Sequence, residues 1–243
     1  IVKRLMKESF ERKTDFCWHC HTGVYSFPLR IAVRFGVPLV IWGEPLSELS
    51  AYYTYENDDV EFEDEEKFNM VRNLGITADD MYGMIHSDDF PVDRRDLLPY
   101  TYPTAEELER LGCYSVCLGS FIPWDYRRQT KLIMDELGWV GLDIESAPRE
   151  VNGEFAKVEC WLQGTRDYIK YLKRGYGRVT QLVNFEIRNG RMTAEEGRRL
   201  VEMYDAFKPA SLDVFLEYMG MSEREFNDIV LKFVVEPWTP DLD

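Results

Sequence analysis

Two cysteines and two histidines lie within five positions of the segment FCWHCHTG, residues 16–23. Cys17 and Cys20 have the spacing at which two thiolates hold one zinc ion or two corners of an iron–sulfur cluster. A closed zinc site needs two further ligands, for which His21 or His19 and one of Cys117, Cys113 or Cys160 are candidates. The same spacing at a helix start also suits a redox-active thiol pair, and buried structural cysteines are the third interpretation.

Polar and aromatic residues follow two apolar segments of strand length. Trp42, Gly43 and Glu44 come directly after VPLVIW, and Trp124 and Asp125 end the segment GSFIPWD. A carboxylate at a strand end can accept hydrogen bonds from ribose or sugar hydroxyls, and a glycine permits close approach of a ligand. For Trp42, Gly43 and Glu44 the alternative is a turn at the strand exit with a solvated glutamate.

Positive charge gathers around two glycines in KYLKRGYGRVT, although the chain as a whole is acidic. Lys170, Lys173, Arg174 and Arg178 are candidates to bind a phosphate or carboxylate. The alternative is a helix C-terminus, capped by glycine, where cations complement the helix dipole. An opposite run, with eight acidic residues between positions 56 and 66, is typical of a solvated loop.

The elements that must position these groups follow an α/β pattern up to about residue 150. Residues 37–42 and 113–120 are apolar on both faces and predict covered strands of a parallel sheet. A capping box at Thr104 and Glu107 starts a helix that ends at Gly112. A further helix follows Asp125 as its N-cap. This order implies right-handed crossovers, with ligands bound beyond the carboxyl ends of the strands.

An apolar stripe also predicts a helix before the first strand. Its members are Val24, Phe27, Ile31 and Phe35, and Gly36 is expected to end the helix. Because Pro28 lies inside this stripe, we expect a kink or a late start.

The rest of the chain is predicted to be helical. Five segments between residues 161 and 233 have helical spacing, and Thr193 with Glu196 and Ser222 with Glu225 form two more capping boxes. The sequence therefore predicts two domains, an α/β domain over residues 1–150 and a helical domain over residues 151–243.

Composition restricts the class of protein. The chain has 243 residues, a formal net charge of −15 and five cysteines, an odd and small number that favours a reducing cytoplasm over a secreted disulfide scaffold. The negative charge opposes nucleic-acid binding, and no apolar run is long enough to predict a membrane span. The opening residues IVKRLMKESFER read as a helix already under way, so we expect N-terminal residues to be missing.

Four segments together resemble the N-acetyl sugar amidotransferases of the PP-loop ATP pyrophosphatase superfamily. They are CWHCHTGVYSFPLRIAVRFGVPLVIWGE, GSFIPWD, KYLKRGYGRVTQLVNFEIRNGRMTAEE and DVFLEYMGMSEREFNDIV, in the family's order. The family acts in the biosynthesis of lipopolysaccharide O-antigens and of glycans that contain nonulosonic acids.

The resemblance implies part of a Rossmann-like adenine nucleotide alpha hydrolase core followed by a helical region. It implies that ATP with Mg²⁺ activates the acetamido oxygen of a sugar as an adenylate. Ammonia from separate glutaminase and cyclase-like subunits then leaves an acetamidino group. The CxxC motif matches one that holds an iron–sulfur cluster in related tRNA thiolases.

Two departures from the family pattern bear on activity. The SGGKDS-type phosphate-binding loop is absent from these 243 residues, and Pro45 stands where an Asn is expected after WGE. This chain alone is therefore expected to be catalytically incomplete. A tRNA thiolase of the same superfamily and a non-catalytic module that docks partner proteins are the alternative functions.

Overall fold

The structure, a computed structural model, describes residues 1–43, 72–118, 121–122, 125–141, 145–152 and 160–242. The chain divides into two compact units, Ile1–Trp124 and Asp125–Asp243, and each is described by itself. The helix that follows Asp125 lies in the second of these units. The domain boundary after residue 150 stays a prediction of the sequence.

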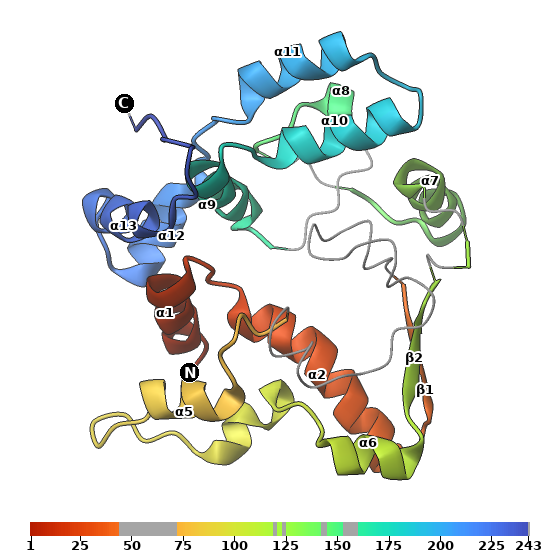
Figure 1. The fold of residues 1–243 in the computed structure, drawn as a ribbon, viewed down its shortest axis with the longest axis vertical. Coiled ribbons are helices and arrows are strands. Elements are labelled where there is room, and N and C mark those ends of the chain that lie inside the picture. Colours follow the sequence, from red (N-terminus) through yellow and green to blue (C-terminus); the bar gives the residue numbers. More distant parts are fainter. Residues whose placement is uncertain (44–71, 119–120, 123–124, 142–144, 153–159, 243) are drawn as a thin grey trace. The chain divides into compact units, whose positions relative to one another are not determined.

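Helices form most of both units (Figure 1). The first unit contains α1 (Val2–Lys13), α2 (Trp18–Phe35), β1 (Leu39–Trp42), α5 (Ala78–Ile85), the 3-10 helix η2 (Arg94–Tyr100), α6 (Ala105–Leu111) and β2 (Tyr114–Cys117). The second contains α7 (Tyr126–Leu137), α8 (Arg149–Asn152), α9 (Gln163–Arg174), α10 (Arg178–Arg188), α11 (Ala194–Tyr204), α12 (Ser211–Met219), α13 (Glu223–Val230) and the 3-10 helix η5 (Leu231–Phe233).

The predicted pairing of parallel strands is confirmed. β1 and β2 form a two-stranded parallel sheet, with Leu39 opposite Tyr114 and Trp42 opposite Cys117. Their carboxyl ends therefore lie at the same edge of the sheet. The described residues combine helices with this small sheet, whereas the larger Rossmann-like core stays a prediction.

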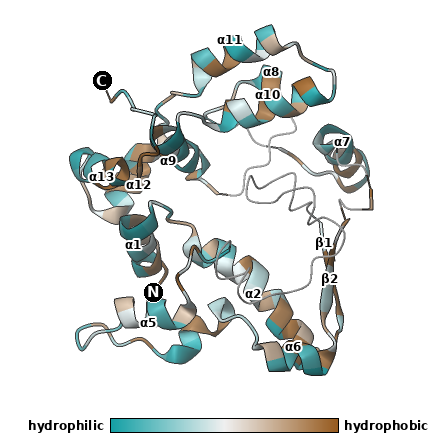
Figure 2. Ribbon diagram, viewed as in Figure 1, coloured by the Kyte–Doolittle hydropathy of each residue, from teal (hydrophilic) through white to brown (hydrophobic). Residues whose placement is uncertain are grey.

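The prediction that these strands are covered on both faces is wrong, because in the described part of the first unit only one face is packed, where Val40 meets the cluster of Leu29, Tyr102 and Leu108. Leu39 and Ile41 are exposed although β1 is apolar, as its hydrophobic colour in Figure 2 shows. Tyr114 of β2 is exposed as well. Parallel strands are normally covered on both faces, but no described element of this unit covers these side chains.

The apolar stripe of α2 also faces outward. Val24, Phe27, Ile31 and Phe35 are all exposed, and the buried face of α2 carries Trp18, Thr22, Ser26, Leu29 and Ala32. Of the two predicted effects of Pro28, the late start is wrong, because α2 begins at Trp18 and continues through the proline, and the kink stays a prediction. The predicted end at Gly36 is confirmed, with a left-handed backbone at φ 69°.

Helix ends follow the local chemistry of the sequence. The three predicted capping boxes start α6, α11 and α13, and Asp125 caps α7 through the backbone N–H of Arg127. A fourth box, at Thr77 and Asp80, starts α5 and was not predicted. Gly112 and Gly175 end α6 and α9 in the left-handed conformation.

Trp18 organises the core of the first unit. It is fully buried, and its indole N–H donates to the carbonyl oxygen of Ile76 at 2.9 Å. Around it pack Leu5, Met81, Ile85, Val92 and Leu97, which come from α1, α5, the segment after α5, and η2. A smaller cluster of Leu29, Tyr102 and Leu108 joins α2 to α6.

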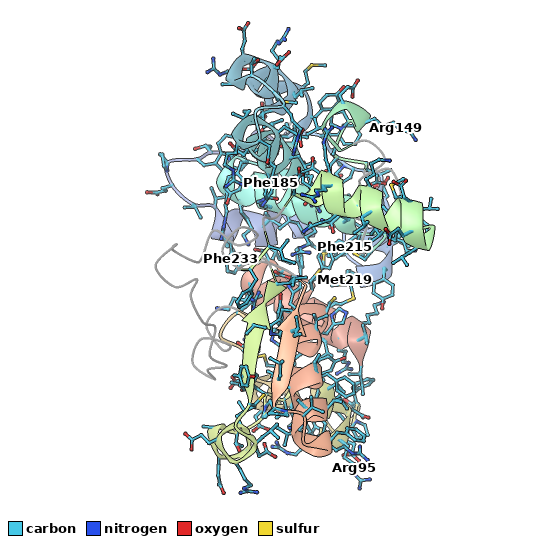
Figure 3. All side chains as sticks on the ribbon, turned by 90° about the vertical axis from the view of Figure 1, so that its right-hand side faces the viewer. Arg95, Arg149, Phe185, Phe215, Met219 and Phe233 are labelled. Carbon is cyan, nitrogen blue, oxygen red and sulfur yellow. The ribbon has the colours of Figure 1, made fainter. Side chains whose placement is uncertain are left out.

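The second unit has its own core. Phe215 and Met219 lie one turn apart on α12 and are both buried (Figure 3), and the ring of Phe215 meets that of Phe226 edge to face at 6.0 Å. The segment after η5 closes the end of α9, because the Trp238 indole donates to the carbonyl oxygen of Leu172 at 3.1 Å.

Close packing at Gly164 in α9 provides a direct test of this core. A Cβ atom added there would lie 2.8 Å from Pro209 Cβ and 2.4 Å from Glu145 Oε2. We expect Gly164→Ala to lower the free energy of unfolding by at least about 1 kcal/mol, because overpacking forces neighbours to move.

The matched control is Gly83→Ala in α5, where an added Cβ meets nothing within 4 Å. This change is expected to raise stability by roughly 0.5–1 kcal/mol, since alanine is the better helix former. Denaturant unfolding of both variants measures the contrast, and equal effects would contradict the packing at Gly164.

Candidate functional site

The residues at the carboxyl end of β1 are open to ligands but already packed on one side. The ring of Trp42 lies 5.1 Å from that of Tyr25, and the Arg72 guanidinium stacks over Tyr25 at 3.8 Å. Gly43 is exposed, and a Cβ added there would meet nothing within 4 Å. Glu44 and Trp124, the other predicted members of this site, lie outside the described residues.

Asp125 has a structural role in the second unit. Its carboxylate accepts a hydrogen bond from the backbone N–H of Arg127 at 3.1 Å and another from Arg191 Nη1 at 3.0 Å. It is therefore engaged as the N-cap of α7 and as an ion-pair partner. Its predicted role in binding nucleotide or sugar stays a prediction.

Next to Asp125 lies a buried carboxylate that the sequence did not single out. Glu186 is 1% exposed and accepts hydrogen bonds from Tyr126 Oη at 2.6 Å, Arg127 Nε at 3.2 Å and Arg191 Nε at 2.9 Å. Burial acts to raise the pKa of Glu186, but the hydrogen bonds and the two arginine charges outweigh it and hold the pKa below its usual value. Burial, and then its bond to Glu186, raise the pKa of Tyr126 to about 12.

The CxxC motif forms the first turn of α2. Cys17 is the N-cap residue and is buried, and its backbone N–H donates to Asp15 Oδ1 at 2.7 Å. Cys20 is exposed, and neither cysteine is in a disulfide. Because they are three residues apart on a helix, the two side chains project from the same side of α2.

The histidines of the motif differ in environment. His19 Nδ1 is buried, and no described residue forms a hydrogen bond with it. Burial lowers the pKa of this histidine, although Asp15 opposes the shift. His21 is partly exposed. Cys117 is the last residue of β2, where it pairs with Trp42 of β1. Within the described ranges, no three histidine, cysteine or acidic side chains are grouped closely enough to hold a metal ion.

The predicted cation cluster spans the end of α9 and the start of α10. Arg178 Nε donates to Asp167 Oδ2 at 3.1 Å, and Arg174, which is exposed, donates to Tyr176 Oη at 3.4 Å. The Lys173 side chain is partly exposed. Gly175 ends α9 in the left-handed conformation, as the alternative interpretation of a glycine-capped helix C-terminus predicted. The cluster is therefore a helix end at which positive charge is concentrated.

Lys170 is the member of this cluster whose surroundings are most unusual. Its Nζ lies 4.6 Å above the ring of Tyr176. Burial lowers the pKa of Lys170 to about 8, assisted by the nearby charges of Arg178 and Arg174 and opposed by Asp167 and Asp205. The sequence identified Lys170 through local charge but could not show that it is desolvated.

The start of α10 already has an anionic partner. Asp205 accepts hydrogen bonds from the backbone N–H groups of Gly177 at 2.8 Å and Thr180 at 3.1 Å, and also from the Thr180 hydroxyl. A bound anion would therefore be held by the side chains of the cation cluster rather than by these backbone donors.

Comparison with known proteins concerns the unit that contains this cluster. No curated protein matches the chain. Among the described residues, no helix has both the length and the apolar character that crossing a bilayer requires. Residues 152–238, which include all of α9 to α13, match a family model described as "LPS biosynthesis protein WbpG-like, C-terminal domain". This part of the chain is thus similar to the C-terminal domain of WbpG-like proteins of lipopolysaccharide biosynthesis.

Proposed function

We propose that the chain is part of an ATP-dependent amidotransferase that converts the acetamido group of a sugar to an acetamidino group in the biosynthesis of lipopolysaccharide or a related surface glycan. The observation that carries this proposal is the match of residues 152–238 to the WbpG-like C-terminal domain. The amidotransferase-like segments of the sequence extend the likeness to the first unit.

The chain would contribute groups that bind and orient substrates. Lys173, Arg174 and Arg178 would hold anionic groups. Trp42, Gly43 and Glu44 would lie near nucleotide or sugar, and so would Trp124 and Asp125. Ammonia would come from glutaminase and cyclase-like partner subunits. We place the reaction in the cytoplasm, because the small, odd number of cysteines is unlike a secreted disulfide scaffold.

These residues do not by themselves fit ATP with Mg²⁺. The sequence has no glycine-rich phosphate loop of the SGGKDS type, and the N-terminus of α10 is already capped by Asp205. Backbone N–H groups of such a loop are what cradles a pyrophosphate. ATP binding would therefore need polypeptide that these 243 residues do not include.

The test uses the protein with any residues that naturally precede Ile1, and ammonium chloride replaces the partner subunits. With MgATP and acetamido sugars, we expect AMP and pyrophosphate only when sugar and ammonium are both present. Mass spectrometry should show one oxygen of the sugar replaced by an NH group. Release of ADP alone, or the same turnover with a sugar that lacks the acetamido group, would reject the proposal.

The CxxC motif at the start of α2 favours one alternative, a tRNA-modifying thiolase of the same superfamily. The formal charge of −15 opposes it, since tRNA binding depends on neutralising phosphates. Filter binding of bulk tRNA at physiological salt separates the two functions. Tight binding that weakens steeply with added salt would favour the thiolase.

We further propose that Cys17 and Cys20 hold a zinc ion or an iron–sulfur cluster, with His21 and Cys117 as additional ligands. The shared side of α2 occupied by the two thiols supports this, although the described residues supply no group of three ligands. Elemental analysis of anaerobically purified protein, compared with the Cys17→Ser, Cys20→Ser double variant, tests it. Protein with no stoichiometric metal would leave the cysteines a structural role.

A further inference from the structure

Four polar side chains of α9 lie along one face of the helix. Gln163, Asp167, Lys170 and Arg174 follow one another at intervals of four, three and four residues, which places them in one row. Ile169 and Leu172, which are buried, lie on other faces of α9. The row is therefore a polar strip on an otherwise core-facing helix.

Asp167 anchors this strip. Its side chain is buried and accepts hydrogen bonds from Gln163 Nε2 at 3.2 Å, Ser146 Oγ at 3.2 Å and Arg178 Nε at 3.1 Å. The Arg178 guanidinium is thereby fixed beside α9 through its Nε. Arg178 forms an ion pair with Asp167. The carboxylate of Asp167 is therefore already neutralised by one cation, and Lys170 adds a second positive charge.

Among the described residues, three polar groups around Asp167 have hydrogen-bonding capacity that no protein group uses; one is the buried Gln163 Oε1, and the other two belong to the partly exposed cations Lys170 and Arg178. Gln163 is 4% exposed, yet its Oε1 accepts no hydrogen bond. In the part of the chain that the structure describes, neither Lys170 Nζ nor the terminal nitrogens of Arg178 donate a hydrogen bond to any protein group. A buried acceptor and two cations with unused donors are unfavourable unless a ligand or water satisfies them.

We propose that Lys170 Nζ and the terminal nitrogens of Arg178 form an oxyanion-binding site, and that Gln163 Oε1 accepts a hydrogen bond from a hydroxyl group of the same ligand. Arginine and lysine donors suit a carboxylate or a phosphate. Gln163 and Lys170 are separated by about 10 Å along the helix axis. The ligand must therefore carry its anion and a hydroxyl group at opposite ends, as a sugar with a carboxylate or phosphate does.

This assignment deepens the proposed function, on which the choice of a sugar as ligand rests. It adds that the second unit recognises the anionic end of the substrate through Lys170 together with Arg178, and a hydroxyl group of the same substrate through Gln163. A carboxylate and a phosphate group of the ligand would bind to the same nitrogen donors. Titration with one probe of each kind distinguishes them.

Anion binding at this site should take up a proton near pH 8–9. Burial, with Arg178 and Arg174, lowers the pKa of Lys170 to about 8, whereas Asp167 and Asp205 act in the opposite direction. An anion beside Nζ favours the charged amine and returns the pKa toward its usual value. Affinity should therefore fall as the pH rises above 8.

Calorimetric titration of the 243-residue chain tests the site with three probes: inorganic phosphate, glucuronate and uncharged glucose. We expect saturable binding of at least one anion at pH 7, none of glucose, and proton uptake at pH 8.5 when two buffers of different ionisation enthalpy are compared. Tighter binding of glucuronate than of phosphate would identify a sugar carboxylate, and the reverse order a phosphate.

The decisive variant is Lys170→Met, which keeps the length of the side chain and removes its charge. It should weaken anion binding by at least about tenfold. The matched control is Lys131→Met on α7, an exposed lysine that pairs with Asp135 at the surface, and here affinity should change by less than about twofold. Thermal unfolding of each variant verifies that it is folded.

Two outcomes would overturn the site: no saturable binding of either anion by the unaltered chain, or equal losses in Lys170→Met and Lys131→Met. Neither measurement uses ATP or turnover. If the chain binds anions but the protein with any residues that naturally precede Ile1 shows no amidotransferase activity, the proposed function alone is refuted. If that protein is active and its activity is insensitive to Lys170→Met, the site alone is refuted.

Discussion

Replacing Glu186 by leucine is expected to lower the free energy of unfolding by about 3 kcal/mol. Leucine has a similar volume but leaves the Arg127 and Arg191 guanidinium groups without their shared carboxylate, and the Tyr126 hydroxyl without its 2.6 Å acceptor. Removing one partner of a buried ion pair typically costs about 3–5 kcal/mol. We expect the lower end, because both arginine side chains are partly exposed, at 32% and 27%, and can regain water.

The loss should depend on pH in a defined direction. Since the pKa of Glu186 in the folded chain is below its usual value, its carboxylate stabilises the fold fully above the pKa of an unfolded glutamate. That stabilisation disappears as the pH falls through the lower, folded value. Denaturant unfolding at pH 7 should therefore separate Glu186→Leu from the unaltered chain more widely than unfolding at pH 3.

The matched control for Glu186 is Glu195→Gln in the first turn of α11. Glu195 is exposed and is not the capping glutamate of that helix, so the change should shift stability by less than about 0.5 kcal/mol. A loss in Glu186→Leu no larger than in this control, or one independent of pH, would contradict the assignment of Glu186 as the centre of the ion-pair network.

The ends of the helices could be predicted because they depend on neighbouring residues. Thr104, Thr193 and Ser222 each have a glutamate three positions later, and the reciprocal hydrogen bonds need no other part of the chain. The box at Thr77 was missed because its third residue is aspartate, whose shorter side chain makes the same two bonds. Local chemistry of this kind can be read directly from sequence.

Burial of the apolar segments could not be predicted in the same way. The residue types of β1 and of the α2 stripe favour removal from water, but which polypeptide covers them is not encoded in the segment itself. Ile41 and Phe35 are 61% and 67% exposed in the described first unit. The apolar runs therefore predicted the strand and the helix correctly, but they could not predict which residues, if any, cover their apolar side chains.

The candidate site shows the same division. Charge clustering around Gly175 pointed to cations near residue 174, because that signal is contiguous in sequence. Glu186 gave no such signal, since its partner Tyr126 is 60 residues away. The desolvation of Lys170 and the unpartnered Gln163 Oε1 arise only when α9 is folded against its neighbours.

The second large effect is expected at Lys170. Substitution by methionine should raise the free energy of unfolding at pH 7, by up to about 3 kcal/mol, because it removes a charge that burial disfavours. The limit follows from a pKa of about 8 against an ordinary value of 10.5, at 1.36 kcal/mol for each unit. The Lys131→Met control should change stability by less than about 0.5 kcal/mol.

The pH dependence of this gain identifies its origin. Below pH 8 the lysine is charged in the folded and the unfolded chain, so its full penalty is present and the advantage of methionine is greatest. Between pH 8 and 10.5 the folded chain has lost the proton that the unfolded chain still binds, so the stability of the unaltered chain rises relative to that of the variant. Denaturant midpoints measured from pH 7 to 10.5 should converge, and a constant difference would mean that packing rather than charge is responsible.

If the Lys170→Met variant is more stable but no longer binds anions, the same charge both lowers the stability of the fold and is needed for binding. A buried charge without a hydrogen-bond partner weakens the fold, so folding alone gives no reason to retain it. Residues that destabilise a protein are commonly those its function requires. Binding of an oxyanion would supply the missing partner, and phosphate or glucuronate should then raise the midpoint of the unaltered chain but leave that of Lys170→Met unchanged.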